Sequence, residues 1–171
     1  LPRLAELAKP GVMAAVVSKR LRVALLTGCA QSVLAPQING ATVRLLTLLR
    51  AEVVIPNDTD CCGALTFHMG ERRQSRKLMG HMIEVWHRKT EGDGLDVIVL
   101  NTSGCATAVR EYEYLFRHDP KIAEKAKAAV ERVREVRRWS PNWCWVRSES
   151  LRGCASPITM PVPIAWSAYK E

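Results

Sequence analysis

The chain has 171 residues, of which 47% are hydrophobic, so it can form one domain with a real core. Its formal charge is +8, but the basic residues follow helical segments such as Arg72-Arg73, without an aromatic-and-basic repeat. We therefore interpret them as a solvated helix face and expect no nucleic-acid partner. No apolar run in the sequence approaches the length needed to cross a bilayer.

The predicted elements alternate between strand and helix along the chain. Short apolar runs predict strands at 22–28, 51–55 and 95–100. Helical spacing predicts helices at 37–50, 65–90 (with a break at Gly70), 106–117 and 121–137. This order predicts an α/β fold, a small parallel sheet of about three strands flanked by helices, with an irregular C-terminal tail. We expect a connector at 1–20, a cysteine-rich domain at 21–138 and the tail at 139–171.

The six cysteines favour a reduced, cytoplasmic protein over a secreted disulfide scaffold. The sequence is rich in predicted helices, it is too long to need disulfide staples, and it shows no signal peptide. We therefore expect the thiols to serve as metal or redox ligands.

The most informative stretch is Asp60-Cys61-Cys62-Gly63-Ala64. Neighbouring cysteines cannot easily bond to each other, because an unstrained disulfide needs Cα atoms about 4.4–6.8 Å apart. Both thiols can, however, face one metal or cluster. Gly63 removes a side chain where the backbone must turn sharply or approach another group.

Two further cysteines, Cys29 and Cys105, also follow predicted strands. Ligands of parallel sheets bind outside the carboxyl ends of the strands. We therefore expect one site at this edge, formed by four thiols: Cys29, Cys61, Cys62 and Cys105. A glycine stands next to a cysteine in each of the three segments. We expect these glycines to contact the cofactor: Gly28, Gly63 and Gly104. The alternative is a set of inert buried cysteines.

Four thiolates suit either zinc or an iron–sulfur cluster. Structural zinc sites normally combine two local cysteine pairs of short spacing, whereas this chain has one pair of adjacent residues. This difference favours an iron–sulfur cluster, which N–H groups at the helix starts after Cys29 and Cys105 would stabilise. Histidines are expected on helix surfaces, although His68 is close enough in sequence to approach the cluster.

Several motifs taken together resemble the cysteine-rich CCG domain family. They are Leu26-Thr27-Gly28-Cys29, Leu34-Ala35-Pro36-Gln37-Ile38-Asn39, Cys61-Cys62-Gly63-Ala64-Leu65-Thr66, His68-Met69-Gly70 and Asn101-Thr102-Ser103-Gly104-Cys105. Within the family the likeness is greatest to the iron–sulfur subunit of glycolate oxidase, with heterodisulfide reductase and lactate-utilisation proteins as relatives. It covers roughly residues 22–137, which correspond to the first of the family's two cysteine-rich repeats. The general family pattern ends in Cys-x-x-Cys, and here Thr102 stands at the first of those two positions.

The resemblance implies an oxidoreductase role in electron transport. In that family a flavin subunit oxidises glycolate to glyoxylate, and the iron–sulfur subunit carries the electrons onward. It implies a cluster on this chain, with [4Fe–4S] favoured, and FAD only on a partner subunit. The implied partners are flavin-containing glycolate oxidase subunits and a membrane quinone pool or another acceptor. The expected location is the cytoplasm, with peripheral attachment to the inner membrane as an option, and we expect no catalytic residues on this chain.

Two other functions stay open from the residues alone. One is a zinc-stapled interaction domain, and the other is a thiol–disulfide redox module that works through Cys61 and Cys62 and is related to heterodisulfide reductase. The absence of a full Cys-x-x-Cys weakens the second.

The segment 139–171 changes abruptly in composition. It contains Trp139, Trp143, Trp145 and Trp166 with Cys144 and Cys154, and no helix or strand period survives. A shifted reading frame permits Tyr-His-Asp-Ala-Cys from the codons of residues 157–162, which resembles the opening of the family's second repeat. We therefore interpret the tail as translated out of frame and Cys144 and Cys154 as non-ligands.

Overall fold

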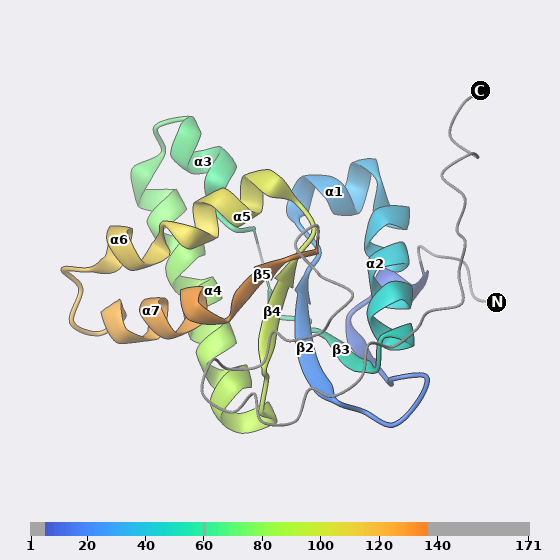
Figure 1. Cartoon of the computed structure of the whole chain (residues 1–171). Coiled ribbons are helices and arrows are strands. Elements are labelled where there is room, and N and C mark those ends of the chain that lie inside the picture. The colour runs from blue at the N-terminus through green and yellow to red at the C-terminus, as the bar shows by residue number, and fades with distance from the viewer. Residues whose placement is uncertain (1–5, 60, 137–171) are drawn as a thin grey trace. The chain divides into compact units, whose positions relative to one another are not determined.

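A computed structural model describes residues 6–59 and 61–136. The predictions made for 139–171 lie outside these residues. In the described part the chain forms an α/β domain around a mixed five-stranded sheet of order β1-β3-β2-β4-β5 (Figure 1). The α/β class is confirmed, and the sheet has more strands than the three expected.

Three strands match the prediction closely and form the parallel centre of the sheet. They are β2 (Leu21–Leu26), β3 (Ala51–Ile55) and β4 (Val97–Leu100). β2 lies between β3 and β4 and is parallel to both. All three are almost entirely buried, as expected for apolar runs covered on both faces. Their carboxyl ends therefore meet at one edge.

The two edge strands are corrections to the predicted fold. β5 (Val133–Glu135) pairs parallel with β4, although these residues were expected to continue a helix. The preceding helix ends at Arg132, and Val133 is extended and buried against the core. β1 (Gly11–Met13) pairs antiparallel with β3, within the segment expected to be a weakly helical connector. Each has only three residues, too few to show a period of two.

The longest of the described helices has 22 residues, and the others are shorter. A 3-10 turn η1 (Glu6–Ala8) precedes α1 (Cys29–Leu34), α2 (Pro36–Leu48), α3 (Ala64–His68), α4 (Arg72–Asp93), α5 (Ser103–Arg110), α6 (Tyr112–Phe116) and α7 (Ala123–Arg132). Pro36 starts α2, and Gly70 separates α3 from α4 with φ of +83°, both as predicted. The single helix expected at 106–117 is two helices that meet at Glu111.

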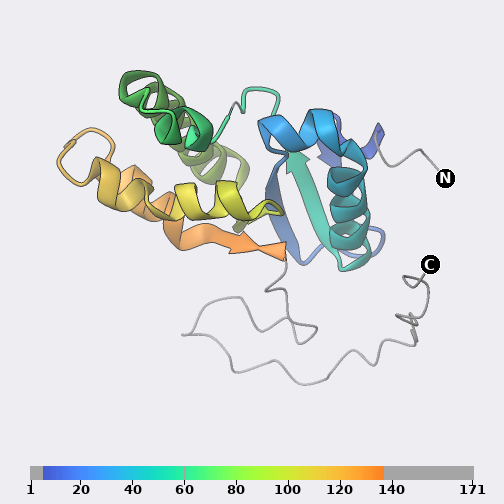
Figure 2. The ribbon, with the colours of Figure 1, turned by 90° about the horizontal axis from the view of Figure 1, so that it is seen from above.

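The sheet is covered on both faces. α2 lies on one face, and α4 to α7 lie on the other (Figures 1 and 2). The larger core joins Trp86 of α4 and Tyr112 and Phe116 of α6 to Ile98 and Leu100 of β4. Each of these side chains is at most 1% exposed, and burying one contributes about 1.5–3 kcal/mol. This core fixes α4 and α5 against the strand ends.

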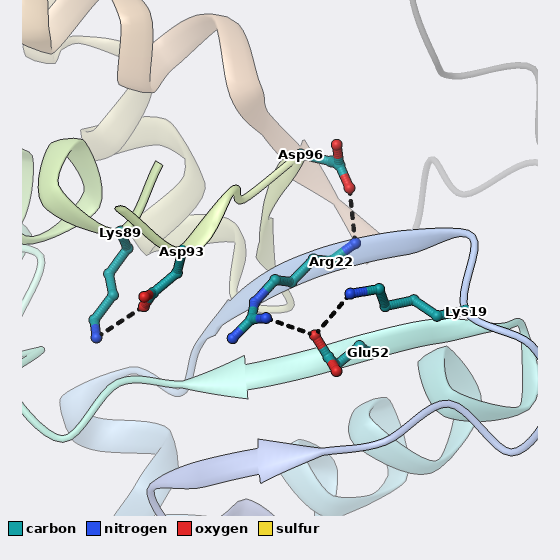
Figure 3. Close-up of polar contacts among 6 residues, drawn as sticks. All are labelled: Lys19, Arg22, Glu52, Lys89, Asp93 and Asp96. Carbon is teal, nitrogen blue, oxygen red and sulfur yellow. Dashed lines mark hydrogen bonds and ion pairs between the residues drawn. The ribbon is translucent and has the colours of Figure 1, made fainter. Parts of the chain in front are cut away.

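Polar contacts secure the opposite edge, where the parallel strands begin (Figure 3). The Glu52 carboxylate pairs with Arg22 at 3.0 Å and with Lys19 at 3.4 Å, and the Arg22 backbone N–H donates to Asp96 at 2.8 Å. On α4, Lys89 and Asp93 form an i,i+4 pair at 3.0 Å. Partly exposed ion pairs of this kind contribute about 1 kcal/mol or less each, so they mainly favour the register in which Arg22 lies opposite Glu52.

Among the described residues, no helix is long and apolar enough to cross a membrane.

Candidate metal centre

The four predicted cysteines lie together at the carboxyl edge of the sheet. Cys29 is the first residue of α1, Cys61 and Cys62 precede α3, and Cys105 lies in the first turn of α5. The Sγ atoms of Cys29 and Cys61 are 3.1 Å apart, and Cys62 and Cys105 lie close enough to shift each other's pKa. Three loops that are distant in sequence thus bring four thiols to one place.

Backbone donors face two of the sulfurs. The backbone N–H of Ala30 partly offsets the rise in the pKa of Cys29, and that of Ala64 partly offsets the rise in the pKa of Cys62. Both N–H groups belong to helix starts, where the first turn leaves its donors without helical partners. The sharp turns that begin α1 and α3 therefore direct N–H groups at sulfur.

The thiols differ in how readily they ionise. Hydrogen bonding to Cys105, followed by burial, raises the pKa of Cys62 far above its ordinary value. The same bond, with Cys62 as the donor, lowers the pKa of Cys105. Burial and then the contact with Cys61 raise the pKa of Cys29. Cys105 is thus the readier thiolate and Cys62 the proton donor, and a metal centre bound here would release the Cys62 proton.

The donor set suits a metal centre, but the sulfurs must separate to hold one. A separation of 3.1 Å is longer than a disulfide bond of about 2.05 Å and shorter than the roughly 3.8 Å between two thiolates on tetrahedral zinc. Consistent with this, no three His, Cys, Asp or Glu side chains of the described residues are arranged to hold a metal ion as they lie. Rotation of the Cys29 and Cys61 side chains away from each other would open the site.

Two of the three predicted glycines are required by the backbone. Gly28 and Gly63 have φ of +69° and +76°, in the region that favours glycine. A Cβ on Gly63 would lie 3.0 Å from Cγ of Met79 and 3.1 Å from the carbonyl oxygen of Ser75. A Cβ on Gly104 would meet nothing within 4 Å. Their contact with a cofactor stays a prediction for all three.

An amide network around the buried Asn39, beside the cysteines, was missed by the sequence reasoning. Asn39 of α2, which is fully buried, joins Gln31 of α1 and Asn101 at the end of β4. A signal was available, because Asn39 lies on the same helical face as the buried Val43 and Leu46. A polar residue on such a face needs buried hydrogen-bond partners.

The described residues thus form an α/β domain with four thiols at the carboxyl ends of its parallel strands. A sequence profile of the family described as a cysteine-rich domain, CCG, matches residues 23–110. The chain belongs to this CCG cysteine-rich domain family.

Similar proteins include two that are named as iron-sulfur subunits. The chain is 31% identical over 127 residues to a probable glycolate oxidase iron-sulfur subunit of Bacillus subtilis, which covers 74% of this chain and 28% of the relative. It is 34% identical over 110 residues to the glycolate oxidase iron-sulfur subunit of Escherichia coli, covering 64% and 27%. It is 32% identical over 116 residues to lactate utilization protein A of Bacillus subtilis, covering 68% and 46%.

The chain therefore spans between about a quarter and a half of the length of these curated relatives. No solved structure is significantly similar to it.

Proposed function

We propose that this domain is an iron–sulfur electron-transfer module in which Cys29, Cys61, Cys62 and Cys105 ligate a cluster, with [4Fe–4S] as the favoured type. The observation that carries the proposal is the meeting of four thiols from three strand ends at one edge. The iron–sulfur names of the relatives support it. A bound cluster would supply one-electron transfer.

The chain's own groups suit this role. The N–H groups of Ala30 and Ala64 donate toward ligand sulfurs, which stabilises negative charge on them. Gly28 and Gly63 permit the two tight turns that present Cys29 and the Cys61-Cys62 pair. Cys62 is only 2% exposed, so its sulfur is shielded from water.

The proposed reaction is the oxidation of glycolate to glyoxylate by a flavin-containing partner subunit, with FAD on that partner. This domain would accept the electrons and pass them to a quinone or another acceptor. Lactate is the second candidate substrate, because lactate utilization protein A is also similar to this chain and has a larger share of its length matched. Both substrates are 2-hydroxy acids that lose two electrons, so they make similar demands on an electron carrier.

Anaerobic loading of the full chain with iron and sulfide tests the ligand proposal. We expect broad absorption at about 400 nm and about four iron and four acid-labile sulfide per chain. Cys105→Ser should lose most of both. Tight zinc without sulfide in the unsubstituted chain would contradict the proposal and favour a zinc-stapled domain.

Mixing the loaded chain with flavoprotein subunits tests the substrate class. We expect reduction of the chain by a glycolate-oxidising flavoprotein with glycolate present. Reduction only by a lactate-oxidising flavoprotein would assign the domain to lactate oxidation instead.

A further inference from the structure

Tyr112 of α6 carries a hydroxyl group into the apolar core. The residue is 0% exposed, its ring stacks on Trp86 with the centroids 6.3 Å apart, and it lies edge-to-face with Phe116 at 6.5 Å. A buried phenol needs a hydrogen-bond partner, because leaving its polar group unpaired away from water costs free energy. Phenylalanine would supply the same ring, so the partner of the hydroxyl shows what Tyr112 does beyond packing.

The partner is the backbone of the cysteine pair. The Tyr112 hydroxyl donates to the carbonyl oxygen of Cys62 at 2.7 Å, in a buried bond that spans 50 residues of sequence. This length is close to the most frequent value for O–H···O bonds, about 2.7–2.8 Å. A phenol has an ordinary pKa of about 10, so it keeps its proton at neutral pH and stays a donor. A side chain of α6 thus holds the peptide group between Cys62 and Gly63.

A second buried hydroxyl holds the next peptide group. Ser75 of α4 is 1% exposed, and its hydroxyl donates to the carbonyl oxygen of Gly63 at 3.0 Å. The same carbonyl accepts hydrogen bonds from the Thr66 hydroxyl and from the backbone N–H of Phe67, each at 3.0 Å. Two helices therefore fix two successive carbonyls. We call the contacts of Tyr112 and Ser75 with these carbonyls the hydroxyl clamp.

Helix α4 also holds the chain just before the cysteine pair. The carbonyl of Asp58 accepts a hydrogen bond from Nε2 of His81 at 2.8 Å, and its carboxylate pairs with Arg88 at 2.9 Å. These contacts are exposed, so water competes with them, whereas the hydroxyl clamp is buried. The clamp is therefore the stronger constraint on the pair.

The orientation of the clamped peptide groups decides where the Cys62 side chain lies. Each residue has only two soft backbone dihedral angles, so holding the carbonyls of Cys62 and Gly63 fixes the direction in which the Cys62 side chain leaves the backbone. Cys62 is buried in the core, while its neighbour Cys61 is half-buried and contacts Cys29 at 3.1 Å. The two adjacent thiols thus have separate environments that a rotated peptide group would disturb.

We propose that Tyr112 is a positioning residue for the metal centre, with Ser75 as its partner, because the hydroxyl clamp holds Cys62 where its sulfur joins the other three. This inference rests on the proposed iron–sulfur function. Groups that orient metal ligands by hydrogen bonds typically change metal affinity by about 10–100-fold when they are removed. Tyr112 thus acts on the centre through the backbone of Cys62.

Iron loss from the loaded full-length chain to excess EDTA, followed anaerobically by the fading of its visible absorption, tests this role. Tyr112→Phe keeps the ring and removes only the hydroxyl. We expect it to lose iron about tenfold faster than the original chain. We also expect an altered electron paramagnetic resonance spectrum of the reduced centre, because a displaced ligand sulfur changes the electronic structure of the cluster. A loss of global stability alone would not move this spectrum.

Two control variants separate positioning from other effects. Tyr114→Phe removes an exposed hydroxyl from the same helix, so it should match the original chain in iron loss and spectrum. Ile98→Val removes one methylene from the core that contains Tyr112 and keeps both clamp contacts, so it should lower stability without changing the spectrum. Iron loss in Tyr112→Phe as slow as in Tyr114→Phe, or an unchanged spectrum in Tyr112→Phe, would overturn the inference while the loaded original chain still supports the proposed function.

Ser75→Ala provides a second variant, which decides the inference if circular dichroism shows that Tyr112→Phe does not fold. It should speed iron loss by a smaller factor, because Thr66 and Phe67 still donate to the Gly63 carbonyl. Unchanged iron loss in Ser75→Ala would then overturn the inference. A Tyr112→Phe chain that folds but takes up no iron and sulfide would support it. Failure of the original chain to load would contradict the proposed function itself, and this inference with it.

Discussion

At the scale of single residues, the glycines of the site differ in what they do. Gly63 has a left-handed backbone and faces Met79 and Ser75 at contact distance, whereas Gly104 lies within α5 with open space around it. The sequence placed both beside a cysteine and could not distinguish them, because φ and the packing of α4 are set by the tertiary fold.

This difference gives a matched pair of substitutions. Gly63→Ala should destabilise the metal-free chain by about 1–3 kcal/mol, because the alanine backbone would be strained and its Cβ would contact Met79. Gly104→Ala should stabilise it by about 0.5–1 kcal/mol, as alanine does within a helix. Denaturant unfolding of both variants measures this.

Equal effects of the two substitutions would contradict the distinction. A stable Gly104→Ala chain that no longer takes up iron and sulfide would instead support the sequence-based prediction that Gly104 contacts the cofactor.

At the scale of secondary-structure elements, strong local signals in the sequence were sufficient to predict several helices and strands. β3, α2 and the α3–α4 break follow from an apolar run, from Pro36 with helical spacing, and from Gly70. β5 could not be predicted in this way, because the helical pattern at 121–137 continues past Arg132, whereas the chain there pairs with β4. Pairing with a distant strand thus overrides local preference at the edges of the sheet.

The site shows the same division. The four cysteines could be predicted to converge, since they stand at strand ends and parallel strands share an edge. The amide network could not, because its members come from α1, α2 and the end of β4, and only their packing shows that they are partners.

The network also predicts how strongly these elements depend on one another. Asn39→Leu should lower the free energy of unfolding of the metal-free chain by at least about 2 kcal/mol. The substitution leaves the half-buried donors of Gln31 and Asn101 and the Thr27 carbonyl without the partner that Asn39 supplies. Gln37→Leu, two residues earlier in α2 and exposed, should change the free energy of unfolding by less than about 0.5 kcal/mol. Denaturant unfolding that gave similar values for both variants would show that the network adds little.

At the scale of the whole molecule, the two ends of the parallel strands have different roles. Ion pairs and the contact of Arg22 with Asp96 stabilise the edge where strands begin, and the thiols and the amide network occupy the edge where they end. The four proposed ligands and the amide network lie within residues 21–138, the predicted domain. That domain limit and the out-of-frame tail remain predictions.

Cys144 and Cys154 of the tail lie outside the proposed ligand set. If the four thiols of the domain form a complete ligand set, Cys144 and Cys154 are dispensable for binding. The double variant Cys144→Ser, Cys154→Ser in the full chain should take up as much iron and acid-labile sulfide as the original, with the same absorption spectrum. Cys29→Ser is the control that should lose uptake, because Cys29 contacts Cys61 directly within the site. Reduced iron content in the double variant would show that the tail supplies ligands, and would also contradict its interpretation as out-of-frame sequence.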